Sequence, residues 1–127
     1  MNQVIIGVGS NIEPDKNICL VREIIKANFN WLSETPPVKT KAIGDVKAPD
    51  YLNCCYFIET KLQRSELKKK LIAIEDQLGR IRNTEIIQTR SIDLDIIVWN
   101  EKVVDEDFYS RDFLRKAVLE LLPELKY

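Results

Sequence analysis

Residues 91–99 read Ser-Ile-Asp-Leu-Asp-Ile-Ile-Val-Trp, and this stretch decides the fold that we predict. Its residues alternate with the period of two that is typical of a β-strand. One face of the predicted strand carries Ile92, Leu94, Ile96 and Val98, and the other carries Asp93, Asp95, Ile97 and Trp99. Aspartate is among the poorest strand formers, so two aspartates on one face of an otherwise strong strand call for an explanation.

A metal site is one interpretation of Asp93 and Asp95. Mg²⁺ prefers hard oxygen ligands, usually takes one or two protein carboxylates, and completes its coordination with water and substrate phosphates. The alternative is that both carboxylates solubilise an exposed face or protect an edge strand from pairing with another chain. The spacing alone leaves both interpretations open.

Residues 80–90, directly before this strand, are polar and aperiodic and predict a surface loop. The loop carries Arg80, Arg82 and Arg90, whose forked guanidinium groups fit phosphate oxygens. Metal and guanidinium groups side by side are what phosphoryl or pyrophosphoryl transfer requires, because that chemistry depends on positioning and charge neutralisation. Arginine-rich loops are also commonly no more than solvated, so this interpretation too has a plain alternative.

A helix is predicted immediately before the loop. Its apolar residues recur at helical spacing and are Leu67, Leu71, Ile74 and Leu78. Ser65 is the expected N-cap, and Gly79 is expected to end the helix in a left-handed conformation. Glu75, near the end of this helix, is interpreted from its position as a solvated boundary residue.

The other elements follow from the same periodicities. The first half of the chain predicts a strand over Val4–Val8 that ends at Gly9-Ser10-Asn11, and then a helix from Pro14 through Ile18, Val21 and Ile25. A strand interrupted by a loop is predicted over 31–50, and a further strand over Tyr51–Leu62. After the strand at 91–99 we expect a turn at Asn100-Glu101, a short segment at Lys102–Val104, and a closing helix through Leu114, Val118 and Leu121 that ends before Pro123. This order is β-α-β-β-α-β plus a C-terminal helix. It predicts an α/β (α+β) protein with a ferredoxin-like antiparallel sheet, helices packed on it, and a single domain over 1–127.

The composition is that of a globular domain. The chain has 127 residues, is 45% hydrophobic and 31% charged, and carries 19 Lys and Arg against 20 Asp and Glu. This charge balance argues against bulk electrostatic binding of nucleic acid. The absence of histidine excludes histidine-dependent triads and histidine-containing zinc sites. Cys19, Cys54 and Cys55 have no metal-ligand spacing, and we expect them to be small buried apolar residues.

No apolar run approaches the roughly 18 residues needed to span a bilayer, and the first residues lack the pattern of a signal peptide. We therefore expect a cytoplasmic protein that binds neither membranes nor nucleic acid. The sequence makes no prediction of oligomeric state.

Several short motifs occur together, in one order, over nearly the whole chain. They are Gly9-Ser10-Asn11, Thr40 through Gly44, Pro49-Asp50-Tyr51-Leu52-Asn53, Glu75 with Leu78-Gly79-Arg80-Ile81-Arg82, Arg90-Ser91-Ile92-Asp93-Leu94-Asp95-Ile96-Ile97, Arg111-Asp112-Phe113 and Leu122-Pro123-Glu124. With these motifs the chain resembles the 6-hydroxymethyl-7,8-dihydropterin pyrophosphokinase family of folate biosynthesis. The resemblance implies transfer of a pyrophosphoryl group from MgATP to the hydroxymethyl oxygen of the pterin, with release of AMP, on a ferredoxin-like scaffold.

The resemblance also implies a role for particular residues. Asp93 and Asp95 would bind two Mg²⁺ ions that bridge the ATP phosphates. Thr40, the backbone near Ile43, Asn53 and Phe113 would bind the pterin, with Phe113 stacked on its ring. Glu75, Arg82, Arg90 and Arg111 would contact the nucleotide, and Arg80, Arg90 and Asp95 would be the catalytic residues.

Some residues differ from the family pattern. Val104-Asp105 stands where the family has a Pro-His pair, and the stretch between Trp99 and Arg111 is shorter than usual. Two further hypotheses are therefore kept beside the enzyme. One is a relative that binds pterin or metal without efficient catalysis, and the other is a ferredoxin-like interaction module.

Overall fold

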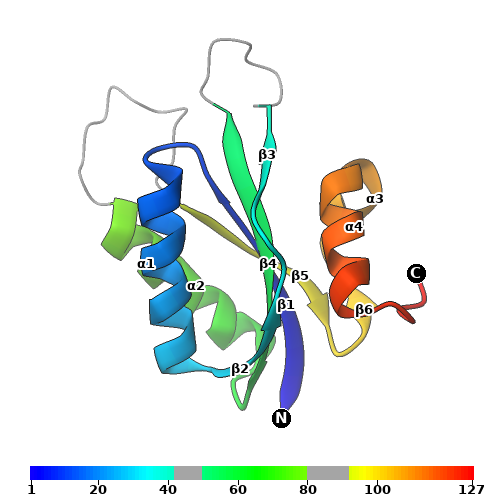
Figure 1. Ribbon diagram of the computed structural model, residues 1–127. Coiled ribbons are helices and arrows are strands. Elements are labelled where there is room, and N and C mark those ends of the chain that lie inside the picture. The colour runs from blue at the N-terminus through cyan, green and yellow to red at the C-terminus, as the bar shows by residue number, and fades with distance from the viewer. Residues whose placement is uncertain (42–49, 80–91) are drawn as a thin grey trace.

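Figure 1 shows the computed structural model, which describes residues 1–41, 50–79 and 92–127. Its elements in chain order are β1 (Asn2–Ser10), α1 (Pro14–Asn28), β2 (Asn30–Glu34), β3 (Val38–Thr40), β4 (Tyr51–Thr60), α2 (Arg64–Gly79), β5 (Asp93–Trp99), β6 (Lys102–Val103), α3 (Asp107–Ser110) and α4 (Asp112–Leu121). The predicted β-α-β-β-α-β order with a C-terminal helix is confirmed, and so is the α/β (α+β) class.

The sheet is antiparallel, and its order is β2-β4-β1-β5-β6. The strand interruption predicted within residues 31–50 is confirmed, because β2 and β3 both pair with β4 along the same edge. Strand β3 pairs with the first residues of β4, and β2 pairs with its last residues. Strand β1 lies in the middle of the sheet, with β4 on one side and β5 on the other.

Helices cover both faces of the sheet. Figure 1 shows α1 and α2 on one face and α3 and α4 on the other. Each face has its own apolar cluster, one built around Val21, Ile25 and Leu71 and the other around Phe108 and Val118. Because β1 is covered on both faces, every residue from Val4 to Ser10 is buried, which explains its continuous rather than alternating apolar pattern.

The predicted alternation along β5 is correct up to Ile97 and wrong after it. The register between β1 and β5 shifts so that Ile5 pairs with Val98 while Ile6 pairs with Ile96. Such a β-bulge adds one residue to a strand and reverses which face the following side chains occupy. Ile97 and Val98 therefore both belong to the cluster beneath α4, and Trp99 packs on the α1 and α2 side.

Two other local predictions need correction. Helix α2 begins at Arg64, so Ser65 lies inside it and is not the N-cap; instead the Gln63 backbone N–H donates to Glu66 Oε1 at 2.9 Å. This carboxylate takes over one of the donors that the first turn leaves unpaired. Cys54 and Cys55 are buried as predicted, but Cys19 is exposed because it lies on the outward side of α1.

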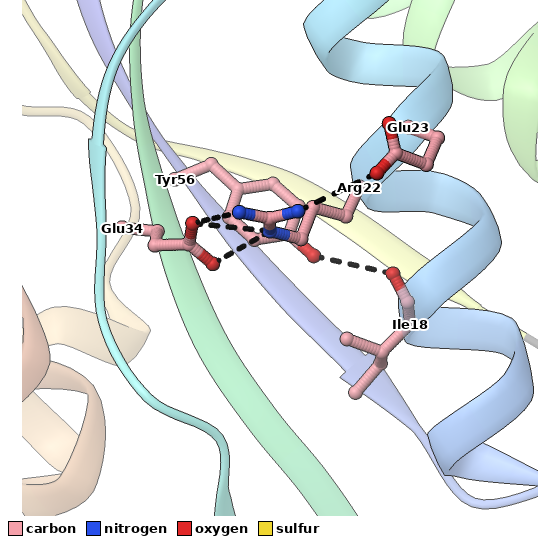
Figure 2. Close-up of polar contacts among 5 residues, drawn as sticks. All are labelled: Ile18, Arg22, Glu23, Glu34 and Tyr56. Carbon is pink, nitrogen blue, oxygen red and sulfur yellow. Dashed lines mark hydrogen bonds and ion pairs between the residues drawn. The ribbon is translucent and has the colours of Figure 1, made fainter.

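An ion pair fastens the edge strand β2 to α1 (Figure 2). Both Nε and Nη2 of Arg22 donate to the Glu34 carboxylate, with Nη2 2.6 Å from Oε2 and Nε 2.8 Å from Oε1. The Arg22 guanidinium also lies 5.5 Å from the ring centroid of Trp31. Beneath it, the Tyr56 hydroxyl donates to the Ile18 carbonyl oxygen, so α1, β2 and β4 are joined at one place.

No helix in the described part of the chain has the length and apolarity that crossing a membrane requires.

The Arg22–Glu34 pair predicts a specific pH dependence of stability. Hydrogen bonding to Arg22 lowers the pKa of Glu34 below its ordinary value of 4.5. A lowered native pKa contributes stability above the unfolded-state pKa, and this contribution is lost as the pH falls through the native one. We expect Glu34→Gln to be less stable than the wild type in urea at pH 7, with the difference shrinking below about pH 4.5. A difference that stays constant down to pH 3 would contradict this role.

Thiol reactivity should follow burial. Burial raises the pKa of Cys54 to about 11 and that of Cys55 to about 12, and only the thiolate is a good nucleophile. We expect a water-soluble aromatic disulfide at pH 8 to label only Cys19 in the native protein and all the cysteines in denaturant. Fast labelling of Cys54 or Cys55 in the native protein would mean that β4 opens readily.

Candidate active site

A cavity of about 920 Å³ lies between the sheet and α4. Its lining includes residues of β1, β3, β4, β5 and α4, so separate parts of the sequence contribute to one site. Of the site residues predicted from the sequence, those that line the cavity are Thr40, Asn53, Asp93, Asp95, Arg111 and Phe113. Residues proposed separately for a metal and for an organic substrate therefore share one cavity.

The register of the sheet arranges these side chains in rows across β1. Gly9 pairs with Asn53 on one side and with Asp93 on the other, and Gly7 pairs with Asp95 in the next row. Directly opposed residues in a sheet share a face, so the amide and both carboxylates point to the same side. The two glycines leave the middle of this face without side chains, and the amide and carboxylates stand on either side of a trough.

Glycine at position 9 allows a close approach of the Asn53 side chain. A Cβ atom at this position would lie 3.0 Å from Asn53 Oδ1 and 3.6 Å from Cδ1 of Tyr51. Asn53 Nδ2 in turn donates to Thr40 Oγ1 at 2.5 Å. The amide is thus fixed between β1 and β3, and an amide held in this way can offer both a donor and an acceptor to a ligand.

Asp93 and Asp95 can hold a divalent cation on the side of the trough opposite Asn53. Asp93 is half-buried and Asp95 is exposed, and both line the cavity. Two carboxylates on one strand face, open to a cavity, suit a cation that takes its other ligands from water and phosphate. The same-face placement predicted from the sequence is confirmed, whereas the roles of Asp93 and Asp95 stay predictions.

Aromatic and basic residues complete the lining. Phe113 lies in the first turn of α4, and Tyr51, which the sequence analysis did not assign to the site, begins β4. Two aromatic rings in one cavity can hold a flat heterocycle by stacking. The guanidinium of Arg111 is 3.7 Å from Asp107 Oδ2, and Lys39 also lines the cavity. Tyr51 could have been found, because it lies two residues before Asn53 in a quoted motif.

The remaining predicted residues do not line this cavity or are not described. Ile43, Arg80, Arg82 and Arg90 lie outside the described residues. Glu75 is half-buried on α2, which packs against the opposite face of the sheet, so it lies at the boundary of the core as its position predicts, and its contact with nucleotide stays a prediction. Its Oε2 atom accepts a hydrogen bond of 2.7 Å from the Leu94 backbone N–H, between the two aspartates.

Comparison with known proteins decides the family. A family model described as 7,8-dihydro-6-hydroxymethylpterin-pyrophosphokinase matches residues 5–123. The chain belongs to this family. A 2-amino-4-hydroxy-6-hydroxymethyldihydropteridine pyrophosphokinase of Haemophilus influenzae is 27% identical, over 94% of this chain and 81% of that protein. The enzyme of the same name from Campylobacter jejuni is 33% identical, over 78% of this chain and 64% of that protein.

The match also extends to a fungal relative. The folic acid synthesis protein fol1 of Schizosaccharomyces pombe is 28% identical over 74% of this chain, which corresponds to 14% of that longer protein. The family match includes every residue of the chain that lines the cavity. The resemblance drawn from the motifs is therefore confirmed at the level of the family.

The space above Gly9 determines what an added methyl group at this position should do. We expect Gly9→Ala to push the Asn53 amide away and to weaken its bond to Thr40, at a cost of about 1 kcal/mol in the free energy of unfolding. Side-chain amide signals of Asn53 in ¹H–¹⁵N spectra should shift strongly. Gly7→Ala is the matched control, because its Cβ would meet the Ile97 side chain at 3.1 Å instead. Unchanged Asn53 signals in Gly9→Ala would contradict the assignment.

Proposed function

We propose that this protein transfers the pyrophosphoryl group of ATP to the hydroxymethyl oxygen of 6-hydroxymethyl-7,8-dihydropterin and releases AMP. One observation carries the proposal beyond family membership. An oriented amide and a pair of carboxylates lie on opposite sides of β1 and open into the same cavity. The reaction needs this juxtaposition, since it joins a neutral heterocycle to a highly charged polyphosphate.

The pterin end of the cavity is assigned to Asn53, Thr40, Phe113 and Tyr51. A pterin ring presents a lactam oxygen, ring nitrogens and an amino group along one edge, and the fixed Asn53 amide offers both kinds of hydrogen-bonding group to that edge. Aromatic rings from α4 and β4 can stack on its faces. Orientation by both contacts would aim the hydroxymethyl group toward β5.

The phosphate end is assigned to Asp93 and Asp95, which would hold Mg²⁺; two ions are proposed when ATP is bound. Bound Mg²⁺ supplies positive charge that neutralises the phosphate oxygens during transfer. Asp93 and Asp95 then fix where the polyphosphate lies relative to the hydroxymethyl group. Arg111 lies on the cavity wall and can contact the same anion. Contacts of Arg80, Arg82 and Arg90 with the phosphates stay predictions.

The chemistry is an in-line displacement at the β-phosphorus of ATP. The hydroxymethyl oxygen forms a bond to that phosphorus and gives up its proton to water, the bond between the β-phosphorus and the bridging oxygen of the α-phosphate breaks, and AMP leaves with that oxygen. The protein's contribution is to hold the two reactants within reach and to balance charge. A cytoplasmic location, expected from the sequence, is part of this proposal.

Asp105, which stands where the family has the histidine of its Pro-His pair, is not among the described residues that line the cavity. Asp105 Oδ1 accepts a hydrogen bond of 2.9 Å from the Asp107 backbone N–H at the start of α3. The Asp105 side chain is thus engaged in ordering the turn before α3. This supports an active enzyme over a relative that binds pterin without turnover.

The test is formation of AMP from ATP with 6-hydroxymethyl-7,8-dihydropterin and Mg²⁺. We expect turnover only when all three are present, and a loss of about 100-fold or more in Asp95→Asn, because one metal ligand loses its negative charge. Asp15→Asn, an exposed change in the first turn of α1, is the matched control and should keep wild-type activity. If the wild type binds pterin in calorimetry but forms no AMP, the proposed enzymatic activity is wrong and the protein is a pterin-binding relative.

A further inference from the structure

We propose that Glu75 is a positioning residue that holds the two-aspartate segment of β5 in its metal-binding geometry from the opposite face of the sheet. The proposal rests on the function proposed above. It assigns Glu75 a role through the protein backbone, beside the contact with nucleotide that the family resemblance implies.

The decisive contact is a hydrogen bond between a carboxylate and a peptide group. Leu94 N–H donates to Glu75 Oε2 at 2.7 Å. The Leu94 side chain is buried on the α1 and α2 side, whereas Asp93 and Asp95 line the cavity on the other side. The donor belongs to the peptide plane that joins Asp93 to Leu94. Its orientation therefore sets the direction in which the Asp93 carboxylate leaves the strand.

The position of Leu94 in the sheet makes this bond important. On one side β5 pairs with β1 over its length. On the other side its partner β6 pairs only with Val98 and Trp99, so the described sheet has no strand beside the metal-binding segment. A peptide of an edge strand is held by its neighbour on one side only, and its outward N–H needs another acceptor. Glu75 is that acceptor, and α2 holds it there.

The surroundings of Glu75 make it a rigid support. One residue earlier, Ile74 is 5% exposed, and Leu71 on the same helix is 1% exposed in the same apolar cluster. A helix anchored in this way holds the Glu75 carboxylate at a fixed height beside β5. Groups that orient metal ligands without touching the metal typically matter by about 10–100-fold in metal affinity or activity.

Two conservative variants distinguish the effect of the hydrogen bond to Leu94 from the effect of the negative charge of Glu75. Glu75→Gln loses the negative charge and keeps an oxygen at the same reach, whereas Glu75→Asp keeps the charge and withdraws the carboxylate by one methylene. We expect Glu75→Asp to need about 10–100-fold more Mg²⁺ for half-maximal rate, with the KM for pterin unchanged. Glu75→Gln should stay close to the wild type. Gln77→Ala, exposed on the same helix, is the control.

The opposite ranking would overturn the proposal. If Glu75→Gln needs far more Mg²⁺ than the wild type and Glu75→Asp does not, the charge matters and the bond does not. A change confined to the KM for ATP at saturating Mg²⁺ would show a direct nucleotide contact instead.

A measurement without turnover keeps this inference separate from the proposed function. Amide hydrogen exchange at Leu94, followed by NMR, should be slow in the wild type and in Glu75→Gln and fast in Glu75→Asp. Binding of Mn²⁺ with a non-hydrolysable ATP analogue, followed by electron paramagnetic resonance, should weaken in the same order. Equal Leu94 exchange in all three proteins would refute the positioning role, whether or not the wild type forms AMP. A wild type without AMP formation would refute the proposed function alone.

Discussion

Antiparallel pairing on both sides of β1 is the constraint on which the rest of the structure depends. Through it Asn53 on β4 and Asp93 on β5 come to face each other across Gly9, although they are far apart in the sequence. The two helical layers pack against the same strand from opposite faces. A shift of one residue in either register would turn the amide or the carboxylates to the wrong face, so pairing fixes the composition of the site as well as the fold.

The glycines of β1 show how the fold accommodates that site. Glycine weakens a strand, because it has more freedom to lose and no side chain to pack. Here Gly7 and Gly9 lie in the strand that is paired along both sides, next to the buried β-branched residues Ile6 and Val8. The surrounding pairing and burial offset the local cost. The gain is a trough on one face of the sheet that a larger side chain would fill.

Local patterns predicted the elements and the same-face aspartates, because periodicity and turn residues depend on neighbours in the sequence. The bulge at Ile97, the exposure of Cys19 and the start of α2 at Arg64 escaped prediction. Each depends on contacts that local spacing does not encode. The same holds for the site. The motifs indicated Asn53 and Phe113, while the pairing of the Asn53 amide with Thr40 depends on how β3 joins the edge of β4.

Glu75 acts at the edge of the sheet, whereas the residues discussed so far act on its face. A metal site on one face of a sheet needs ligands whose backbone does not move, yet an edge strand has hydrogen-bonding strand partners on only one side. In the stretch of β5 that carries the aspartates, a carboxylate from α2 takes the place of a missing strand. The helix layer remote from the cavity thereby stabilises the geometry within it. Selection on α2 would then act on metal binding as well as on packing, although no residue of α2 lines the cavity.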